Sequence, residues 1–123
     1  MEQLQTKRIR FSKEADSWLR VMKSRTEITP NLLCRLGFCL SLEEGGIPEN
    51  EKYDEGSDRE INRYTLLGDL ELVLTSLLRQ RLQADGIPLT EMDRQFRAHL
   101  HRGVVLLAGR LKALTDLAAV LTC

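Results

Sequence analysis

The stretch KRIRFSKEADSWLRVMKSRTEITPNLLCRLGFCLSL, residues 7–42, decides the fold class of the chain. Residues 7–12 alternate basic and apolar side chains with the period of two that is typical of a half-buried strand. Ser12 is a suitable N-cap, and apolar side chains then recur every three or four positions, so the sequence predicts a helix over residues 13–24. The unit therefore begins with a short strand and an amphipathic helix.

A second helix is predicted over residues 31–42, because Thr29 can cap it and Pro30 suits its first turn. One strand followed by two helices is the order of a ribbon-helix-helix DNA-binding unit. A single strand has unpaired edges, so we expect the strand of a second copy to pair with it and complete a two-stranded ribbon. A dimer, or a dimer of dimers, is then the simplest closed assembly.

A two-stranded ribbon fits the major groove of DNA, and its outward side chains can reach base edges. The alternation places Arg8 and Arg10 on the outward face, while Ile9 and Phe11 point toward the core. An alternative is a solvated strand edge whose cations only discourage aggregation. The candidate DNA-contacting residues are seven basic side chains of this unit: Lys7, Arg8, Arg10, Lys13, Lys23, Arg25 and Arg35.

The charges are balanced overall but unevenly distributed along the chain. Lys and Arg number 18, as do Asp and Glu. Residues 1–40 contain eight basic against four acidic side chains, whereas residues 41–60 contain two against eight. A phosphate-binding surface, if the chain has one, is therefore expected from the first 40 residues.

The whole chain, residues 1–123, is predicted to form one mainly α domain. Residues 7–42 are its ribbon-helix-helix-like unit, residues 43–60 an acidic loop that we expect to be mobile, and residues 61–121 a helical remainder. The finer expectations for the remainder are a short extended segment at residues 60–66 and helices at residues 69–84 and about 91–102. Gly103 and Gly109 are expected to divide the rest of the chain into one or two helical pieces.

The sequence offers little evidence for an enzyme, and it predicts neither a bound metal nor a cofactor. His99 and His101 are two residues apart on a predicted helix, about 200° around its axis, so they cannot face one metal ion. We expect His99 to be a surface or interface residue. The sequence has no Gly-rich phosphate loop, no HExxH and no GxSxG. Tyr53 or Tyr64 could attack a DNA phosphate, but the sequence offers no metal-binding cluster beside them.

The expected compartment is the cytoplasm. No apolar run approaches the roughly 20 residues that a membrane-spanning helix needs. The first residues, MEQLQTKRIRF, contain no apolar stretch of the signal-peptide type. The cysteines are odd in number, and their spacing indicates neither a disulfide framework nor a zinc site.

Four segments of the chain resemble the bacterial DNA sulfur modification protein family DndE: RIRFSKEADSWL, RTEITPNLLCRLGFCLSLEEGGIP, NRYTLLGDLELVLTSLLRQR and HRGVVLLAGRLKAL. The resemblance covers about residues 7–114. It implies a role in DNA phosphorothioation, as the small DNA-binding member of a complex with a sulfurtransferase-like and an ATPase-like subunit. It further implies a homotetramer that favours nicked double-stranded DNA and binds it through positively charged side chains, mostly lysines.

Two functions are therefore weighed. The first is a DNA-binding accessory subunit, without an active site, that uses a basic surface of an oligomer. The second is a protein-interaction scaffold whose apolar helices, residues 31–42 and 69–84, dock the larger subunits with little direct DNA contact.

Overall fold

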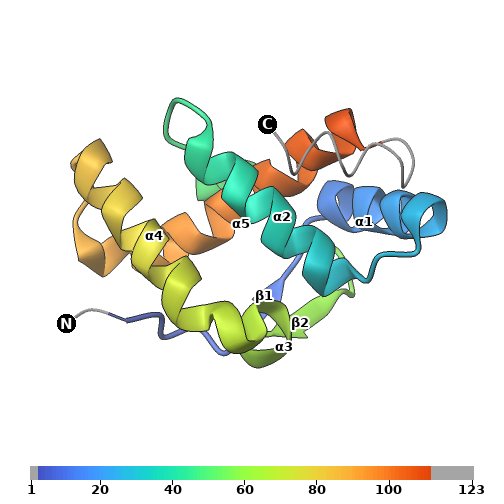
Figure 1. The fold of residues 1–123 in the computed structure, drawn as a ribbon, viewed down its shortest axis with the longest axis horizontal. Coiled ribbons are helices and arrows are strands. Elements are labelled where there is room, and N and C mark those ends of the chain that lie inside the picture. Colours follow the sequence, from blue (N-terminus) through green and yellow to red (C-terminus); the bar gives the residue numbers. More distant parts are fainter. Residues whose placement is uncertain (1–2, 112–123) are drawn as a thin grey trace.

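The computed structural model describes residues 3–111, which form a mainly α domain, as the sequence predicts. Its two strands and five helices are β1 (Arg8–Arg10), α1 (Lys13–Thr26), α2 (Pro30–Glu43), β2 (Glu60–Asn62), α3 (Arg63–Leu67), α4 (Glu71–Asp85) and α5 (Met92–Arg110) (Figure 1). Short 3-10 turns lie at Asn50–Lys52, Gly68–Leu70 and Leu89–Glu91. The part of the predicted helical remainder from residue 112 onward lies outside the described residues.

Helix α1 begins where the sequence predicts. The Ser12 side-chain oxygen accepts a hydrogen bond from the Ala15 N–H at 3.1 Å, which satisfies one of the unpaired donors at the helix start. The helix ends at Glu27, whose backbone is left-handed with φ of 63°. Its buried face includes Ala15, Leu19 and Met22. Spacing of three and four residues thus turns one side of α1 toward the core.

Helices α2 and α5 form the centre of the domain and cross at two glycines (Figure 1). A Cβ atom on Gly103 would lie 2.0 Å from the Gly37 carbonyl oxygen, and one on Gly37 would lie 2.7 Å from the Gly103 carbonyl carbon. The two backbones therefore touch, and α5 runs unbroken through both Gly103 and Gly109. The expected division at these glycines is wrong, because Gly103 serves the close approach of a second helix.

The ribbon is formed within one chain. Strand β1 pairs antiparallel with β2, with Arg8 opposite Asn62, Ile9 opposite Ile61 and Arg10 opposite Glu60. The predicted alternation is confirmed, since Ile9 is buried and its two neighbours are exposed. The expectation that a second copy supplies the paired strand is wrong for this edge, because residues 60–62 return to it from the same chain.

The acidic loop of residues 43–60 brings β2 back to β1, and arginine side chains tie it down. Arg97 on α5 donates hydrogen bonds to the Tyr53 and Asp54 carbonyls at 2.9 and 2.6 Å. Arg59 binds the Asp16 carboxylate on α1 at 2.6 Å. Burial would raise the pKa of Asp16, but hydrogen bonds from Arg59, Ser57 and Arg20 outweigh it and hold the value at about 2. The loop expected to be mobile is therefore anchored at several points.

Residues 60–67 contain a shorter strand than the sequence predicts, and the strand is followed directly by a short helix. Asn62 ends the strand and caps α3, its side-chain oxygen accepting from the Thr65 N–H at 2.8 Å. The expected extended segment at residues 60–66 is thus correct only for its first three residues. The helix expected at 69–84 is α4, and the one expected at about 91–102 is α5, which continues to Arg110. None of the helices in the described part combines the length and apolarity needed to cross a membrane.

Candidate nucleic-acid interface

The outward side of the β1–β2 ribbon carries exposed charge. The side chains of Arg8 and Arg10 are 76% and 44% exposed, and Lys7 beside them is exposed too. Both arginines face one carboxylate across the ribbon, with Glu60 oxygens 3.7 Å from Arg8 Nη1 and 3.3 Å from Arg10 Nη2. Three cations against one carboxylate leave this side positive. We call the outward side chains Lys7, Arg8, Arg10, Glu60, Asn62 and Tyr64 the ribbon face.

A hollow opens along the ribbon face. One cavity of about 510 Å³ is lined by Gln3, Leu4, Gln5, Lys7, Arg8, Asn62, Arg63 and Tyr64. A second of about 340 Å³ is lined by Arg8, Glu60 and Asn62. The two cavities share Arg8 and Asn62 in their linings, and we call them together the ribbon hollow. Its lining is mostly polar, with the cations Lys7, Arg8 and Arg63, the carboxylate of Glu60 and the aromatic ring of Tyr64.

Arg63 lies in the wall of the ribbon hollow and is engaged inside the protein. Its Nη1 donates to the Leu4 and Thr6 carbonyls at 2.8 and 2.9 Å, and its Nε to Glu71 at 3.0 Å. Its guanidinium carbon lies 5.6 Å from the centroid of the Tyr64 ring, within cation–π distance. Arg63 therefore fixes the N-terminal segment and the aromatic edge together. The sequence analysis missed this role, since i+1 neighbours on a short helix leave no periodic signal.

The other predicted DNA-contacting residues do not gather at the ribbon. Lys13 lies against the acidic loop, its backbone N–H bound to Asp54 at 3.2 Å. Arg35 donates to the Leu66 and Thr65 carbonyls at the end of α3, at 2.7 and 3.2 Å. Lys23 and Arg25 are exposed on the last turn of α1, a helix whose length is about 20 Å at 1.5 Å per residue. Only Lys7, Arg8 and Arg10 of the seven share one surface.

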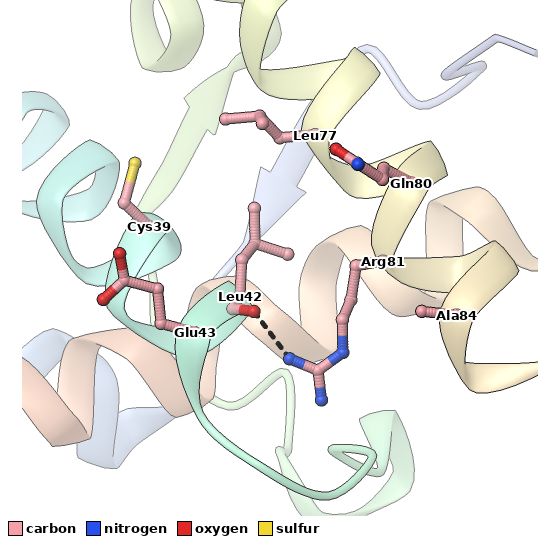
Figure 2. A pocket seen from close by; sticks show the side chains of 7 residues that line it. All are labelled: Cys39, Leu42, Glu43, Leu77, Gln80, Arg81 and Ala84. Carbon is pink, nitrogen blue, oxygen red and sulfur yellow. Dashed lines mark hydrogen bonds between the residues drawn. The ribbon is translucent and has the colours of Figure 1, made fainter.

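An apolar groove is the second candidate surface. It lies between α2 and α4 and has a volume of about 420 Å³ (Figure 2). Its lining residues are Cys39, Leu42, Glu43, Leu77, Gln80, Arg81 and Ala84. Beyond it, α4 exposes further apolar side chains, with Leu72 74% and Val73 54% exposed. Such a patch is typical of a surface that another protein covers.

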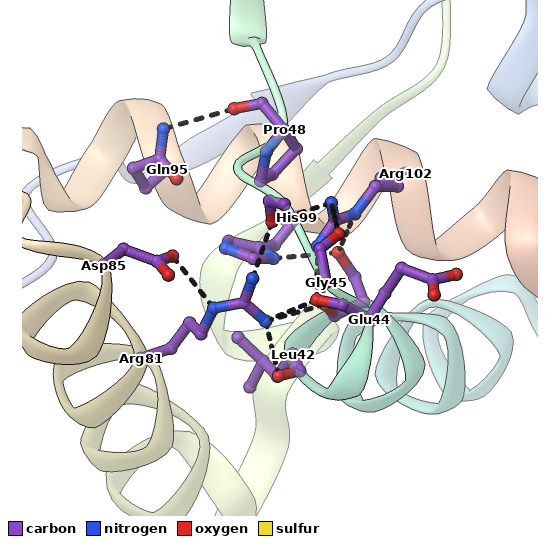
Figure 3. A network of polar contacts seen from close by, with 11 residues as sticks. Leu42, Glu44, Gly45, Pro48, Arg81, Asp85, Gln95, His99 and Arg102 are labelled. Atoms are coloured by element: carbon purple, nitrogen blue, oxygen red, sulfur yellow. Dashed lines mark hydrogen bonds and ion pairs between the residues drawn. The ribbon is translucent and has the colours of Figure 1, made fainter.

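Arg81 and Arg102 enclose the end of α2 in a network of hydrogen bonds (Figure 3). Arg81 donates to the Leu42 and Glu44 carbonyls, both at 2.7 Å, and pairs with Asp85 at 2.8 Å. Arg102 donates to the Ser41 carbonyl at 2.7 Å and to its hydroxyl at 2.9 Å. These guanidinium groups satisfy carbonyls that the end of a helix leaves unpaired. They serve the fold and are not available to a phosphate.

Both histidines are buried, and each has its own partners. The Ser41 hydroxyl lies 2.8 Å from His99 Nδ1, while His101 Nε2 accepts from the Ser12 N–H at 3.0 Å. His101 Nδ1 lies 2.9 Å from the Arg97 carbonyl, so Nδ1 carries the proton. Burial lowers the pKa of each to about 4, and for His99 the nearby Arg102 and Arg81 add to the effect. The expectation that His99 lies at the surface is wrong.

The part of the chain that the structure describes contains neither a metal-binding cluster nor an activated thiol. Within residues 3–111 no group of three or more His, Cys, Asp or Glu side chains is placed to hold a metal ion. Burial raises the pKa of the Cys34 thiol to about 12 and that of Cys39 above its usual value, where Glu43 adds to the effect. These thiols are therefore poor nucleophiles.

Comparisons with known proteins agree on one family. The model of the family described as DNA sulphur modification protein DndE matches residues 8–115. A crystal structure of DndE from Escherichia coli B7A, involved in DNA phosphorothioation modification, is similar with a TM-score of 0.70 and 21% identity, covering 85% of this chain and 99% of that one. A glycine-to-lysine mutant of DndE gives a TM-score of 0.66 with the same identity and coverage. A search of curated proteins finds no significant match.

Proposed function

Because this chain belongs to the DNA sulphur modification protein family DndE, we propose that it binds double-stranded DNA through the ribbon face and serves DNA phosphorothioation as an accessory subunit. The observation that supports the proposal best is the exposed set of Lys7, Arg8 and Arg10, in which the two arginines share the carboxylate of Glu60. Such a surface attracts phosphates and releases their counterions. In this role the protein supplies binding and positioning, and the chemistry belongs to other subunits.

The geometry of the ribbon suits DNA. Hydrogen bonds from Phe11 N–H to the Arg59 carbonyl, and from Arg63 N–H to the Lys7 carbonyl, extend the strand pairing beyond both ends of β1. Arg8 and Arg10 are two residues apart on a strand, so they project to the same side about 6.6 Å from each other. A two-stranded ribbon of this kind is narrow enough for the major groove.

The finer parts of the proposal are a preference for nicked duplexes, a homotetramer and a cytoplasmic location beside the other subunits of the modification complex. The exposed apolar side chains of α4 and the turn before it, Leu70, Leu72, Val73 and Leu77, support an assembly. With one ribbon per copy, a closed assembly would join several ribbon faces into a larger positive surface. Contacts of separate copies with one duplex would add in avidity.

The test is a salt titration of DNA affinity with the variant Lys7→Ala/Arg8→Ala/Arg10→Ala. The slope of log affinity against log salt is expected to fall by roughly 2–3, because each phosphate that the variant no longer neutralises removes about 0.9 from it. The matched control is Lys23→Ala/Arg25→Ala, on the distant turn of α1, which should leave most of the slope in place. An unchanged slope in the ribbon variant, or an equal fall in the control, contradicts the ribbon face as the binding surface.

A scaffold is the second candidate function, and the groove between α2 and α4 favours it (Figure 2). In this case the groove docks a larger subunit and DNA contact is incidental. The variant Leu77→Gln, in the lining of the groove, would then abolish association with the other subunits. The slope of DNA affinity against salt would be shallow already in the unmodified protein.

A further inference from the structure

Tyr64 is an aromatic side chain that the fold does not use. Its side chain is 73% exposed, although the core of the domain is built from leucine, phenylalanine and methionine. A tyrosine exposed to this degree gives up the burial that normally stabilises an aromatic ring. It stands at the edge of the ribbon hollow, beside exposed cations. An exposed ring, exposed cations and a cavity in one place are typical of a binding site for a ligand.

The position of the ring is fixed from two sides. Asn62 caps α3 and so sets the backbone from which Tyr64 projects. Arg63, which is held by two carbonyls and Glu71, lies 5.6 Å from the ring centroid. A cation fixed over the ring restrains its orientation. A pre-positioned ring loses little conformational entropy when another flat group stacks on it.

The N-terminal segment that contributes to the ribbon hollow is fixed as well. The backbone N–H groups of Gln5 and Thr6 both donate to the Asp93 carboxylate, at 2.9 and 3.1 Å. The ribbon hollow therefore has a defined shape, with a volume of about 510 Å³ in its larger part. This lies within the range of pockets that hold small organic ligands, about 300–1,000 Å³.

The lining identifies the class of ligand. Lys7 and Arg8 supply cations for a phosphate, and Arg8 is restrained only by an exposed pair with Glu60 at 3.7 Å. Gln3, Gln5 and Asn62 supply amides that can bond the edge of a base. Proteins bind unstacked bases by stacking them on exposed aromatic rings, with cations nearby that bind the phosphates.

We propose that the ribbon hollow binds one unstacked nucleotide of a DNA strand, with its base on the Tyr64 ring and its phosphate on Lys7 and Arg8. This rests on the DNA-binding function proposed above and specifies which part of the strand the ribbon hollow holds. A base inside an intact duplex has both faces covered by its neighbours and cannot reach the ring. The ribbon hollow therefore favours DNA whose strand end or flap is free to leave the helix.

The experiment compares two probes built on one duplex sequence: a nicked duplex without a flap, and the same nicked duplex with a three-nucleotide flap that carries 2-aminopurine. The full chain is expected to bind the flapped probe about tenfold more tightly than the unflapped one, with a change in 2-aminopurine emission on stacking. Tyr64→Ala should lower flap affinity to that of the unflapped duplex and abolish the emission change. Tyr64→Phe should keep both, because the ring is retained.

The control is Ile47→Ala, which truncates an exposed side chain in the loop after α2, outside the ribbon hollow, and should alter neither affinity. Equal affinity of the unmodified protein for both probes overturns the nucleotide site and leaves the DNA-binding function standing. A flap preference that survives in Tyr64→Ala overturns it too. Binding of neither probe overturns the DNA-binding function, and the nucleotide site with it.

Discussion

The crossing of α2 and α5 and the ribbon face use the same type of side chain in opposite ways. Around the crossing, Arg81, Arg97 and Arg102 donate to backbone carbonyls and close the ends of helices and loops. On the ribbon face, Arg8 and Arg10 share the Glu60 carboxylate, and Arg10 also donates to the Ser57 carbonyl at 3.0 Å, yet their side chains remain 76% and 44% exposed. A guanidinium group has five N–H donors, so it can serve either as a structural clamp or as a phosphate ligand.

This difference explains how a chain of zero net charge can present a positive surface. Several of its arginines bind backbone carbonyls and stabilise the fold. Of the acidic side chains at residues 43–60, Glu60 is the one that pairs with the ribbon arginines. Whether a cation lies beside unpaired backbone carbonyls therefore indicates its function better than the number of cations in the chain does. Four changes test this difference between the centre of the domain, where arginines bind backbone carbonyls, and the ribbon face, where arginines are exposed.

The largest effect is expected at the helix crossing, from Gly103→Ala. The new Cβ would lie 2.0 Å from the Gly37 carbonyl oxygen, a clash with backbone that side-chain movement cannot relieve. We expect the free energy of unfolding to fall by at least about 4 kcal/mol, above the usual cost of overpacking. Urea denaturation measures it.

Gly109→Ala is the matched control, since it lies on the same helix and a Cβ there meets nothing within 4 Å. This change should stabilise the protein by about 0.5–1 kcal/mol, the helix propensity of alanine over glycine. If both variants lose stability equally, the backbone contact at the crossing is not what constrains Gly103.

The next largest loss of stability is expected from Arg102→Ala, which removes a guanidinium group that binds the end of α2. Its guanidinium group binds the Ser41 hydroxyl and the carbonyls of Ser41, Gly45 and Gly46. Hydrogen bonds to a charged group contribute about 1.5–3 kcal/mol, so we expect a loss near the upper value, about 3 kcal/mol, by urea denaturation. DNA affinity at a temperature where the variant is folded should not change. Arg110→Ala, exposed on the last turn of the same helix, should cost little.

The sequence predicts the start of this fold well because local rules control it. Ser12 and the alternation of residues 7–12 specify the strand and the first helix without distant contacts. The partner of the strand could not be predicted in the same way. Ile61 meets Ile9 only after a loop of irregular structure, which arginines far away in the sequence hold in place. No local signal in the sequence marks residues 60–62 as the partner of β1. For this reason the sequence analysis expected the partner strand from a second copy of the chain.

The candidate site was predicted in part for a similar reason. Period-two patterning placed Arg8 and Arg10 outward, and their exposure confirms that placement. Arg35 looked equally available, yet it donates to the Leu66 carbonyl, a contact between segments 31 residues apart. Tyr64 was weighed only as a nucleophile, since its neighbourhood with Lys7 depends on the strand pairing. Tertiary contacts, which a single sequence does not display, decide these cases.

For each titrating group, a smaller effect on stability is expected from acid, and it belongs to the two buried histidines of α5. Burial holds the pKa of His99 and His101 at about 4, below the ordinary value of 6.5. As the pH falls below 6.5, the unfolded chain binds protons before the folded one does. Their stabilising contribution is therefore complete above pH 6.5 and is lost progressively as the pH falls toward 4. Between pH 7 and 5 the loss should be about 2 kcal/mol for each histidine.

Urea denaturation at pH 7 and 5 measures this loss, and His99→Met supplies the comparison. The variant removes one of the two titrating groups, so about half of the pH dependence should disappear over this interval. A variant whose stability falls as steeply as that of the unmodified protein would show that His99 contributes no proton linkage.

The smallest effect is expected on the ribbon face, from Glu60→Gln. Glu60 is the carboxylate that faces Arg8 and Arg10, and an exposed ion pair of this kind contributes about 0.2–1 kcal/mol. Removing the charge should release both arginines and raise DNA affinity about two- to fivefold at low salt, with stability nearly unchanged. Glu49→Gln is the matched control, because it alters the net charge equally at an exposed loop residue that pairs with Lys52. Equal gains from both variants would mean that net charge, and not the ribbon face, governs binding. A gain confined to Glu60→Gln would mean that the open cations of the ribbon, and not the clamped ones of the centre, meet the DNA.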